Sequence, residues 1–270
     1  MLLKLLIIGP IAIYVALSAA LYFSQTALLF PTSMVQATGV PAAGSERLEL
    51  ITAEGHRLVG SHIPPSDPRE RGKRVILGFG GNAWNAEAAG DYLAGLYPEA
   101  DVVVFHFRGY APSGGKPSAA ALLADAPLIY DLAAAEFPQA RIVAVGFSIG
   151  SGVAAHLAGR RPLAGVILVT PFDSLAKLAH SHYPWLPVRL LLRHRMEPAA
   201  DLSGSAVPVA LIQAGGDTLI PPEQALGLRV AGRHIVLDRT VPGVGHNDIY
   251  EDPVFRGTMD QALDRFFLAD

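Results

Sequence analysis

The chain has 270 residues, which is enough for one large domain or two small ones, and half of them are apolar, so a sizeable core can be buried. The formal net charge of −3, with no long run of one sign, gives no indication of a nucleic-acid partner. Cysteine is absent, which excludes disulfides, thiolate nucleophiles and cysteine metal sites.

The N-terminal segment is apolar and uncharged over residues 5–23, which is long enough to span a bilayer as a helix. Lys4 precedes this segment and the next basic residue is Arg47, so the positive-inside rule predicts a cytoplasmic N-terminus and a catalytic domain on the outer, periplasmic side. Ser18-Ala19-Ala20 would also suit a signal peptidase, and a cleaved, secreted or periplasmic form stays open. The length of the apolar run favours a single-pass anchor.

We expect residues 1–24 to form this anchor (or signal peptide), residues 25–46 a polar connector that contains prolines, and residues 47–270 one catalytic domain. Residues 171–206 lie between two predicted strands and are longer than a simple crossover. They predict either a small helical cap over the active site, which we favour, or ordinary crossover helices.

Predicted strands and helices alternate through the catalytic domain, which indicates an α/β fold with a mostly parallel sheet and helices on both faces. An antiparallel hairpin is expected first, over residues 47–52 and 57–63. Further strands are expected at residues 74–79, 101–107, 141–147, 164–170, 208–214 and 234–240, and helices near 86–96, 119–136, 151–158, 222–230 and 253–268.

The segment Gly146-Phe147-Ser148-Ile149-Gly150 follows a β-branched apolar run and precedes a predicted helix, the context of a nucleophile elbow. A serine there sits on a sharp turn with its hydroxyl above the sheet, and the glycines avoid clashes with neighbouring elements. The backbone N–H of Ile149 can point at a developing oxyanion. The alternative is a serine without a catalytic role in a glycine-lined turn.

A serine nucleophile needs a base within hydrogen-bond reach and an acid that orients the base, and in this fold class the chain order is serine, acid, histidine. Asp217 follows a predicted strand through Gly215-Gly216, although an aspartate there could equally serve only as a turn or helix cap. His246 lies in a glycine loop after the last strand and is the expected base. Asp201, Asp238, His156 and His234 fit worse by position; His106 could line the site, and His180 and His182 are expected to face solvent.

The second oxyanion donor is expected in the loop after the strand 74–79, where Asn82 is the candidate. The same loop matches a relaxed dinucleotide-binding fingerprint, Gly78-Phe79-Gly80-Gly81-Asn82-Ala83, with Arg108 placed to meet a ribose phosphate. We reject that interpretation because it leaves the elbow, Asp217 and His246 unexplained. Side chains that could line a substrate site are Trp84, Arg108, Tyr110 and Phe172.

With these motifs in place, the chain resembles membrane-anchored members of the α/β-hydrolase superfamily, in the group of the fission-yeast bud-emergence-like proteins and the animal protein depalmitoylases. The resemblance covers nearly the whole chain and implies Ser148 as nucleophile, Asp217 as acid, His246 as base, and Asn82 with Ile149 as oxyanion donors. Relatives usually carry a histidine where this chain has Gly80, which puts loop rigidity and substrate range in doubt. The motifs that carry it are residues 25–31, Gly81-Asn82-Ala83, Phe107-Arg108-Gly109-Tyr110, residues 113–117, residues 146–150, Pro171-Phe172-Asp173-Ser174, Gly216-Asp217 and Gly245-His246-Asn247.

The sequence therefore predicts a serine hydrolase that cleaves carboxylic esters or thioesters through an acyl-enzyme, without cofactor or metal, on a small-molecule or lipid-like acyl substrate near the membrane. The depalmitoylase activity of relatives is not carried over, because fold does not fix substrate. A serine peptidase or amidase, or a non-catalytic membrane-tethered scaffold on the same fold, stays open. Acyl length, leaving group, biological role and oligomeric state are not encoded in any motif of this chain.

Overall fold

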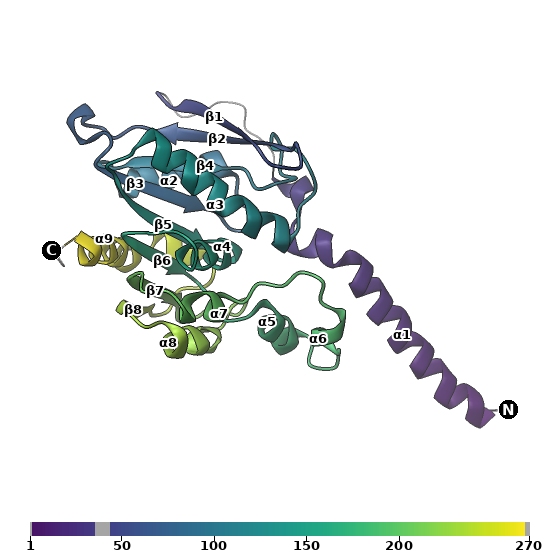
Figure 1. The fold of residues 1–270 in the computed structure, drawn as a ribbon. Coiled ribbons are helices and arrows are strands. Elements are labelled where there is room, and N and C mark those ends of the chain that lie inside the picture. Colours follow the sequence, from purple (N-terminus) through teal and green to yellow (C-terminus); the bar gives the residue numbers. More distant parts are fainter. Residues whose placement is uncertain (1, 36–43, 268–270) are drawn as a thin grey trace.

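Eight strands form one sheet in the order β1-β2-β4-β3-β5-β6-β7-β8 in the computed structural model, which describes residues 2–35 and 44–267 (Figure 1). β1 and β2 are antiparallel to their neighbours, whereas β4, β3, β5, β6, β7 and β8 run parallel. The predicted mostly parallel sheet with helices on both faces is confirmed. The strands are β1 Glu46–Ile51, β2 Arg57–Ile63, β3 Arg74–Phe79, β4 Asp101–Phe105, β5 Arg141–Phe147, β6 Gly165–Val169, β7 Val209–Ala214 and β8 Ile235–Val241.

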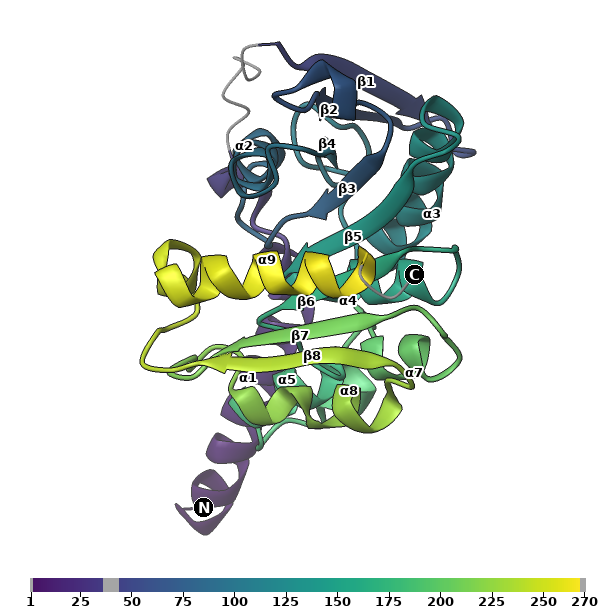
Figure 2. The ribbon, with the colours of Figure 1, turned by 90° about the vertical axis from the view of Figure 1, so that its left-hand side faces the viewer.

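The two faces of the sheet carry separate cores because side chains alternate along each strand. In β5, Ile142 and Ala144 belong to one core, while Val143 and Val145 belong to the other. α3 (Ala119–Glu136), α4 (Ile149–Ala158) and α8 (Leu226–Ala231) cover the first face. α2 (Ala86–Leu96) and α9 (Pro253–Phe267) cover the second, and Figure 2 shows α9 lying across it. The parallel strands are therefore buried on both sides, as their continuous apolar sequences require.

The N-terminal helix α1 runs from Leu2 to Leu29 and stands out from the body of the protein (Figure 1). Within it begins a stretch, Ile8–Met34, that is long and apolar enough to cross a membrane. The helix continues five residues past the expected end of the anchor at residue 24, and the following Phe30 is 2% exposed in the core. The helix therefore extends into the first residues of the expected polar connector, because Ala27, Leu28 and Leu29 continue it. Residues 36–43 of the connector lie outside the described part.

The segment 171–206 divides into helices with different neighbours. α5 (Leu175–His182) and the short α6 (Val188–Leu191) project toward α1 (Figure 1). α7 (Pro198–Ser203) packs against α4 as a crossover helix does. One half of the segment is thus set apart from the sheet, and the other half is part of it.

Polar contacts attach α1 to the chain that follows α6. The Gln25 side chain donates to the carbonyl oxygen of Leu191 (3.1 Å) and accepts from the N–H of Arg193 (2.7 Å). The Thr26 hydroxyl lies 2.8 Å from Nε2 of His194, whose pKa is lowered by burial and by the neighbouring Arg193. The last turns of α1 are therefore an anchored element of the domain.

Candidate active site

Ser148 occupies a strained turn between β5 and α4. Its φ of 53° lies in the region that L-residues avoid, at a cost of about 1–3 kcal/mol. The surroundings hold it there: the Ser148 N–H donates to the Val169 carbonyl (3.0 Å), and the Ser151 hydroxyl donates to the Ser148 carbonyl (2.6 Å). A Cβ on Gly146 would meet the backbone of Gly150. The glycines of the motif are thus required by close backbone approach, as the elbow geometry demands.

The structure brings His246 and Asp217 to this serine. Nε2 of His246 lies 3.1 Å from the Ser148 hydroxyl oxygen, and Nδ1 lies 2.6 Å from Oδ2 of Asp217. These side chains follow β5, β7 and β8 at their carboxyl ends, so the parallel sheet gathers them at one edge. The Asp217 side chain is 1% exposed and the His246 side chain 12%, so the hydrogen-bonded chain is shielded from water.

The two carboxylate oxygens of Asp217 have different partners. Its Oδ1 accepts hydrogen bonds from the N–H groups of Leu219 (2.9 Å) and Ile220 (2.7 Å), which is the capping role. Its Oδ2 is left for His246. The Gly216 N–H donates to the Val244 carbonyl (2.8 Å), which ties the acid loop to the histidine loop. The carboxylate is therefore fixed in position before any substrate binds.

The oxyanion loop after β3 lies directly over the elbow. A Cβ placed on Gly81 would be 3.8 Å from Cβ of Ser148. The Tyr110 hydroxyl donates to the Asn82 carbonyl (2.8 Å), which orients the peptide groups of this loop. Ile149 is the first residue of α4, where N–H groups have no partner within the helix. Asn82 thus belongs to the loop over the elbow and Ile149 begins the helix that follows it; that their N–H groups form the oxyanion hole stays a prediction.

The four side chains that could line a substrate site each make contacts within the fold. Arg108 is buried and forms an ion pair with Asp125 and Glu54, so it is part of the scaffold. Burial raises the pKa of Asp125, and the hydrogen bonds from Arg108 oppose that shift. Tyr110 is 2% exposed and acts on the Asn82 carbonyl described above.

Phe172 and Trp84 also pack against neighbouring side chains. Phe172 is 1% exposed, and a Cβ on Gly152 would lie 3.1 Å from its ring. Trp84 packs in an aromatic cluster with the rings of Tyr92, Phe147 and Tyr250. Arg108, Tyr110 and Phe172 are thus buried and Trp84 is half-buried, and that these four residues line the substrate site stays a prediction.

Three other histidines have local contacts, whereas His180 is exposed, as expected. His106 is buried 3.7 Å from Glu87, and its burial lowers its pKa. His156 contacts Asp201 on α7 at 3.1 Å. His182 is exposed, as expected, and its Nε2 donates to the Leu219 carbonyl oxygen (2.8 Å) at the rim of a cavity.

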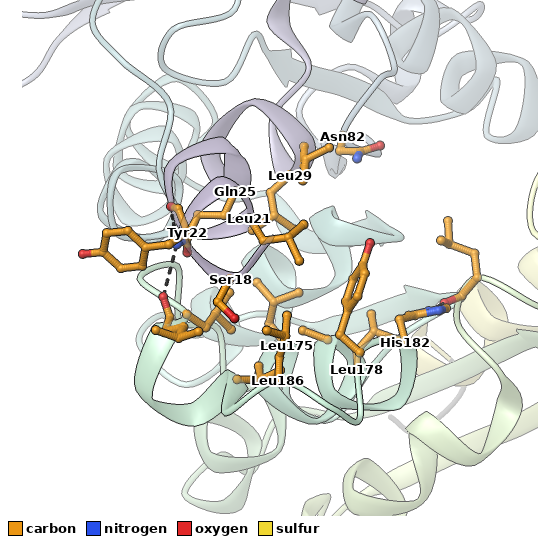
Figure 3. A pocket seen from close by; sticks show the side chains of 17 residues that line it. Ser18, Leu21, Tyr22, Gln25, Leu29, Asn82, Leu175, Leu178, His182 and Leu186 are labelled. Atoms are coloured by element: carbon orange, nitrogen blue, oxygen red, sulfur yellow. Dashed lines mark hydrogen bonds between the residues drawn. The ribbon is translucent and has the colours of Figure 1, made fainter. Parts of the chain in front are cut away.

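An apolar cavity of about 400 Å³ lies between α1 and the helices α5 and α6 (Figure 3). Sequence reasoning missed it because it is formed by segments more than 140 residues apart. A signal is present in hindsight: Ser18, Leu21, Gln25 and Leu29 recur at helical spacing and therefore share one face of α1. Within residues 2–35 and 44–267, no cluster of three or more histidine, aspartate or glutamate side chains could hold a metal ion.

Comparisons with known proteins agree with this architecture. A family model described as the alpha/beta hydrolase fold matches residues 75–193. An uncharacterized protein of Mycobacterium tuberculosis, Rv2307c, is 32% identical over 250 residues, which cover 88% of each chain. The lysophosphatidylserine lipase ABHD12 of Danio rerio is 28% identical over 170 residues, which cover 54% of this chain and 44% of the lipase. The solved Pyrococcus furiosus esterase PF2001 has a TM-score of 0.66 at 15% identity, over 88% of this chain and 93% of the esterase.

Proposed function

The chain belongs to the α/β-hydrolase family, and we propose that it is a serine hydrolase that cleaves carboxylic esters or thioesters. The observation that carries the proposal is the continuous hydrogen-bonded chain from Asp217 through His246 to Ser148. The esterase and lipase among similar proteins support hydrolysis as the reaction class. The finer assignment to esters or thioesters is supported by the apolar helix α1, which would place the site beside lipid-like acyl substrates.

The proposed reaction begins with proton transfer. Asp217 accepts the hydrogen bond from Nδ1–H of His246, so the free lone pair lies on Nε2, facing the Ser148 hydroxyl. His246 removes the hydroxyl proton as the serine oxygen attacks the acyl carbon, and the carbonyl oxygen becomes an oxyanion. The backbone N–H groups of Asn82 and Ile149 would stabilise this oxyanion, and each such donor typically contributes about 3–4 kcal/mol in the transition state.

The second half of the cycle uses the same groups. The imidazolium of His246 gives its proton to the leaving alcohol or thiol, and the carbon–oxygen or carbon–sulfur bond breaks to leave an acyl ester on Ser148. A water molecule then donates a proton to His246 and attacks the acyl-enzyme. Collapse of the second intermediate releases the carboxylic acid and returns the proton to Ser148. No step uses an oxidant, a reductant or a metal.

We place this activity at a membrane surface. α1 is long and apolar enough to cross a bilayer, and its last turns are bonded to the catalytic domain. The basic residue Lys4 precedes the apolar run, which under the positive-inside rule puts the catalytic domain on the outer side. Esters and thioesters of membrane-borne acyl chains are then the substrates within reach.

Steady-state hydrolysis tests the proposal. The full-length protein in detergent is assayed on p-nitrophenyl butyrate and on butyryl thioester, beside Ser148→Ala and a control, Ser181→Ala, which removes a hydroxyl from α5. We expect turnover by the wild type and by Ser181→Ala, and none above background by Ser148→Ala. Hydrolysis of neither substrate by a folded wild type, or equal hydrolysis by Ser148→Ala, would contradict the proposal.

A further inference from the structure

We propose that the cavity between α1 and the α5–α6 helices holds the acyl chain of the substrate, so that the membrane anchor itself forms one wall of the binding site. This inference rests on the proposed hydrolase function and adds the substrate class: esters of long, single acyl chains drawn from a membrane. Figure 3 shows the two walls facing each other, with Ser18, Leu21 and Gln25 from α1 on one side and Leu175 and Leu178 from α5 on the other.

The lining has the chemistry of a hydrocarbon site. Most of the side chains are leucine, alanine or valine, and no aspartate, glutamate, lysine or arginine is among the described residues that line the cavity. Its volume of about 400 Å³ lies within the range of small-molecule sites, which is about 300–1,000 Å³. A charged or strongly hydrated ligand would lose its water there without compensation, so an alkyl chain is the group that fits.

The cavity approaches the proposed catalytic residues through Asn82 and Leu219. Asn82, whose N–H is the proposed oxyanion donor, is part of the lining and lies at one end of the group in Figure 3. Leu219 also lines the cavity, and its N–H donates to Asp217 (2.9 Å). An acyl carbon held at Ser148 would therefore extend its chain between these two residues and along α1.

The lining residues of α1 extend over a length similar to that of a membrane lipid chain. From Leu29 to Ser18, α1 lines it over eleven residues, which at 1.5 Å per residue is about 16 Å. A bilayer core of about 30 Å contains two leaflets, so one acyl chain spans about 15 Å. A long acyl chain could therefore lie along this wall over its full length.

The surroundings of the cavity indicate that the acyl chain of the substrate comes from a membrane. The N-terminal part of α1 is exposed and apolar, with Ile11 57% and Leu17 51% exposed. The loop between α5 and α6 reaches this part of the helix, where the Tyr14 hydroxyl donates to the Trp185 carbonyl (3.2 Å). Trp185 and Leu190 are exposed, and tryptophan at such a position suits a membrane–water interface. The far end of the cavity therefore lies where lipid chains are available.

The wall formed by α1 is fixed, which a binding site requires. Gln25, which lines the cavity, is held by two hydrogen bonds, one to the last residue of α6 and one to the backbone after it. Thr26, on the next position, contacts His194 (2.8 Å). These contacts set the spacing of the two walls, so the size of the cavity is determined by folded structure and not by collapse of the anchor onto the domain.

The test compares chain lengths in matched variants of the full-length protein. Leu21→Trp fills the cavity from α1, whereas Leu17→Trp makes the same change one turn away at a side chain outside the lining. For the wild type, kcat/KM should rise from p-nitrophenyl butyrate to the decanoate, by about fourfold for each methylene that is buried. We expect Leu21→Trp to lower the decanoate-to-butyrate ratio about tenfold or more, and Leu17→Trp to leave it within about twofold of wild type.

Ala179→Phe, which fills the cavity from α5, should lower the ratio in the same way and guards against misfolding of Leu21→Trp. A wild type that hydrolyses both esters with a ratio unchanged in Leu21→Trp and Ala179→Phe overturns the acyl-chain site and leaves the hydrolase standing. A wild type that hydrolyses neither ester overturns the hydrolase. Titration with a fluorescent twelve-carbon fatty acid then decides the site: binding weakened by Leu21→Trp but not by Leu17→Trp supports it, and equal binding overturns it.

Discussion

Two histidines lie beside buried aspartates at opposite ends of the same sheet, and they differ in what faces the second ring nitrogen. His246 contacts Asp217 after β7 and the hydroxyl of Ser148. His62, in β2, contacts Asp101 at the start of β4 (2.7 Å) and Glu46 in β1 (3.2 Å). Both pairs are shielded from water. The aspartate alone therefore does not make a histidine a base.

The second partner decides the role. Carboxylates accept hydrogen bonds only, so His62 donates to both partners when its ring is protonated, and the cation then joins two strands. Burial lowers the pKa of His62, but the hydrogen bonds to Asp101 and Glu46 raise it by more, and the net shift is upward. His246 faces a hydroxyl that can donate, so its Nε2 keeps a lone pair. The first arrangement stabilises the fold, and the second is suited to proton transfer.

Replacing each histidine by glutamine in turn should give the largest difference between the catalytic and the structural role. We expect His246→Gln to lower kcat by about 10⁶-fold, because the base and the serine act as one unit. His62→Gln should keep kcat within about twofold, since it lies at the other end of the sheet. Ester turnover of the folded fractions checks both. Similar losses in the two variants would contradict the distinction.

The acid should show a smaller effect than the base. Asp217→Asn can keep the oxygen that accepts from Leu219 and Ile220 while presenting an amide to His246, which favours the wrong tautomer. We expect a fall in kcat of about 10⁴-fold with the melting temperature nearly unchanged. Kinetics and thermal unfolding of the same sample measure the two quantities, and a mild kinetic loss would remove Asp217 from its proposed role.

A substitution in the pair of His62 and Asp101 should lower the free energy of unfolding. Asp101 is fully buried and also accepts from the N–H of Gly72 (2.6 Å). Asp101→Asn leaves His62 with a poorer partner, and we expect about 3 kcal/mol lower free energy of unfolding. Asp131→Asn, which breaks an exposed pair with Arg161, is the matched control and should cost under about 1 kcal/mol. Urea unfolding in detergent measures both; equal costs would contradict the assignment.

The same pair predicts a pH dependence of stability. Because the pKa of His62 is raised in the folded state, its contribution is fully present below the unfolded value of about 6.5 and is lost as the pH rises through the folded value. The difference in free energy of unfolding between wild type and His62→Gln should therefore be larger at pH 6 than at pH 9. A difference that grows toward pH 9 would reverse the sign of this account.

The smallest effect is expected at the oxyanion loop. Tyr110→Phe removes only the hydrogen bond to the Asn82 carbonyl, worth about 1 kcal/mol, so kcat should fall about fivefold. Because the residue positions the loop and does not touch the reacting atoms, we expect KM to stay near its wild-type value. A change in KM with kcat unaltered would place Tyr110 in substrate binding instead.

Local patterns were sufficient to predict the sheet and to select Ser148, Asp217 and His246 as candidates. Strand periodicity and turn glycines are encoded within a few residues, and β5 and α3 have the predicted bounds. Contacts between residues far apart in the chain are not encoded in these local patterns. Arg108 was expected at the substrate, but Asp125 on α3 neutralises it, and a helix face that meets it cannot be inferred from spacing alone.

The cavity between α1 and α5 also depends on contacts that the local sequence does not encode. Residues 5–23 were correctly singled out as apolar, but that pattern does not tell which face of α1 meets the protein. Tyr14 and Trp185, which are in contact, are 171 positions apart. Only the folded chain shows that the polar residues Gln25 and Thr26, expected in a connector, join the helix to the domain.

Labelling with a fluorophosphonate tests the central claim, that His246 and Asp217 make Ser148 a nucleophile, without any assumption about substrate. The full-length protein, Ser148→Ala and the control Ser181→Ala are treated in parallel, and the modified peptide is located by mass spectrometry. The account predicts one phosphonyl adduct on Ser148 in the wild type and in Ser181→Ala, and none in Ser148→Ala. A folded wild type that is not labelled, or labelling that persists in Ser148→Ala, would contradict it.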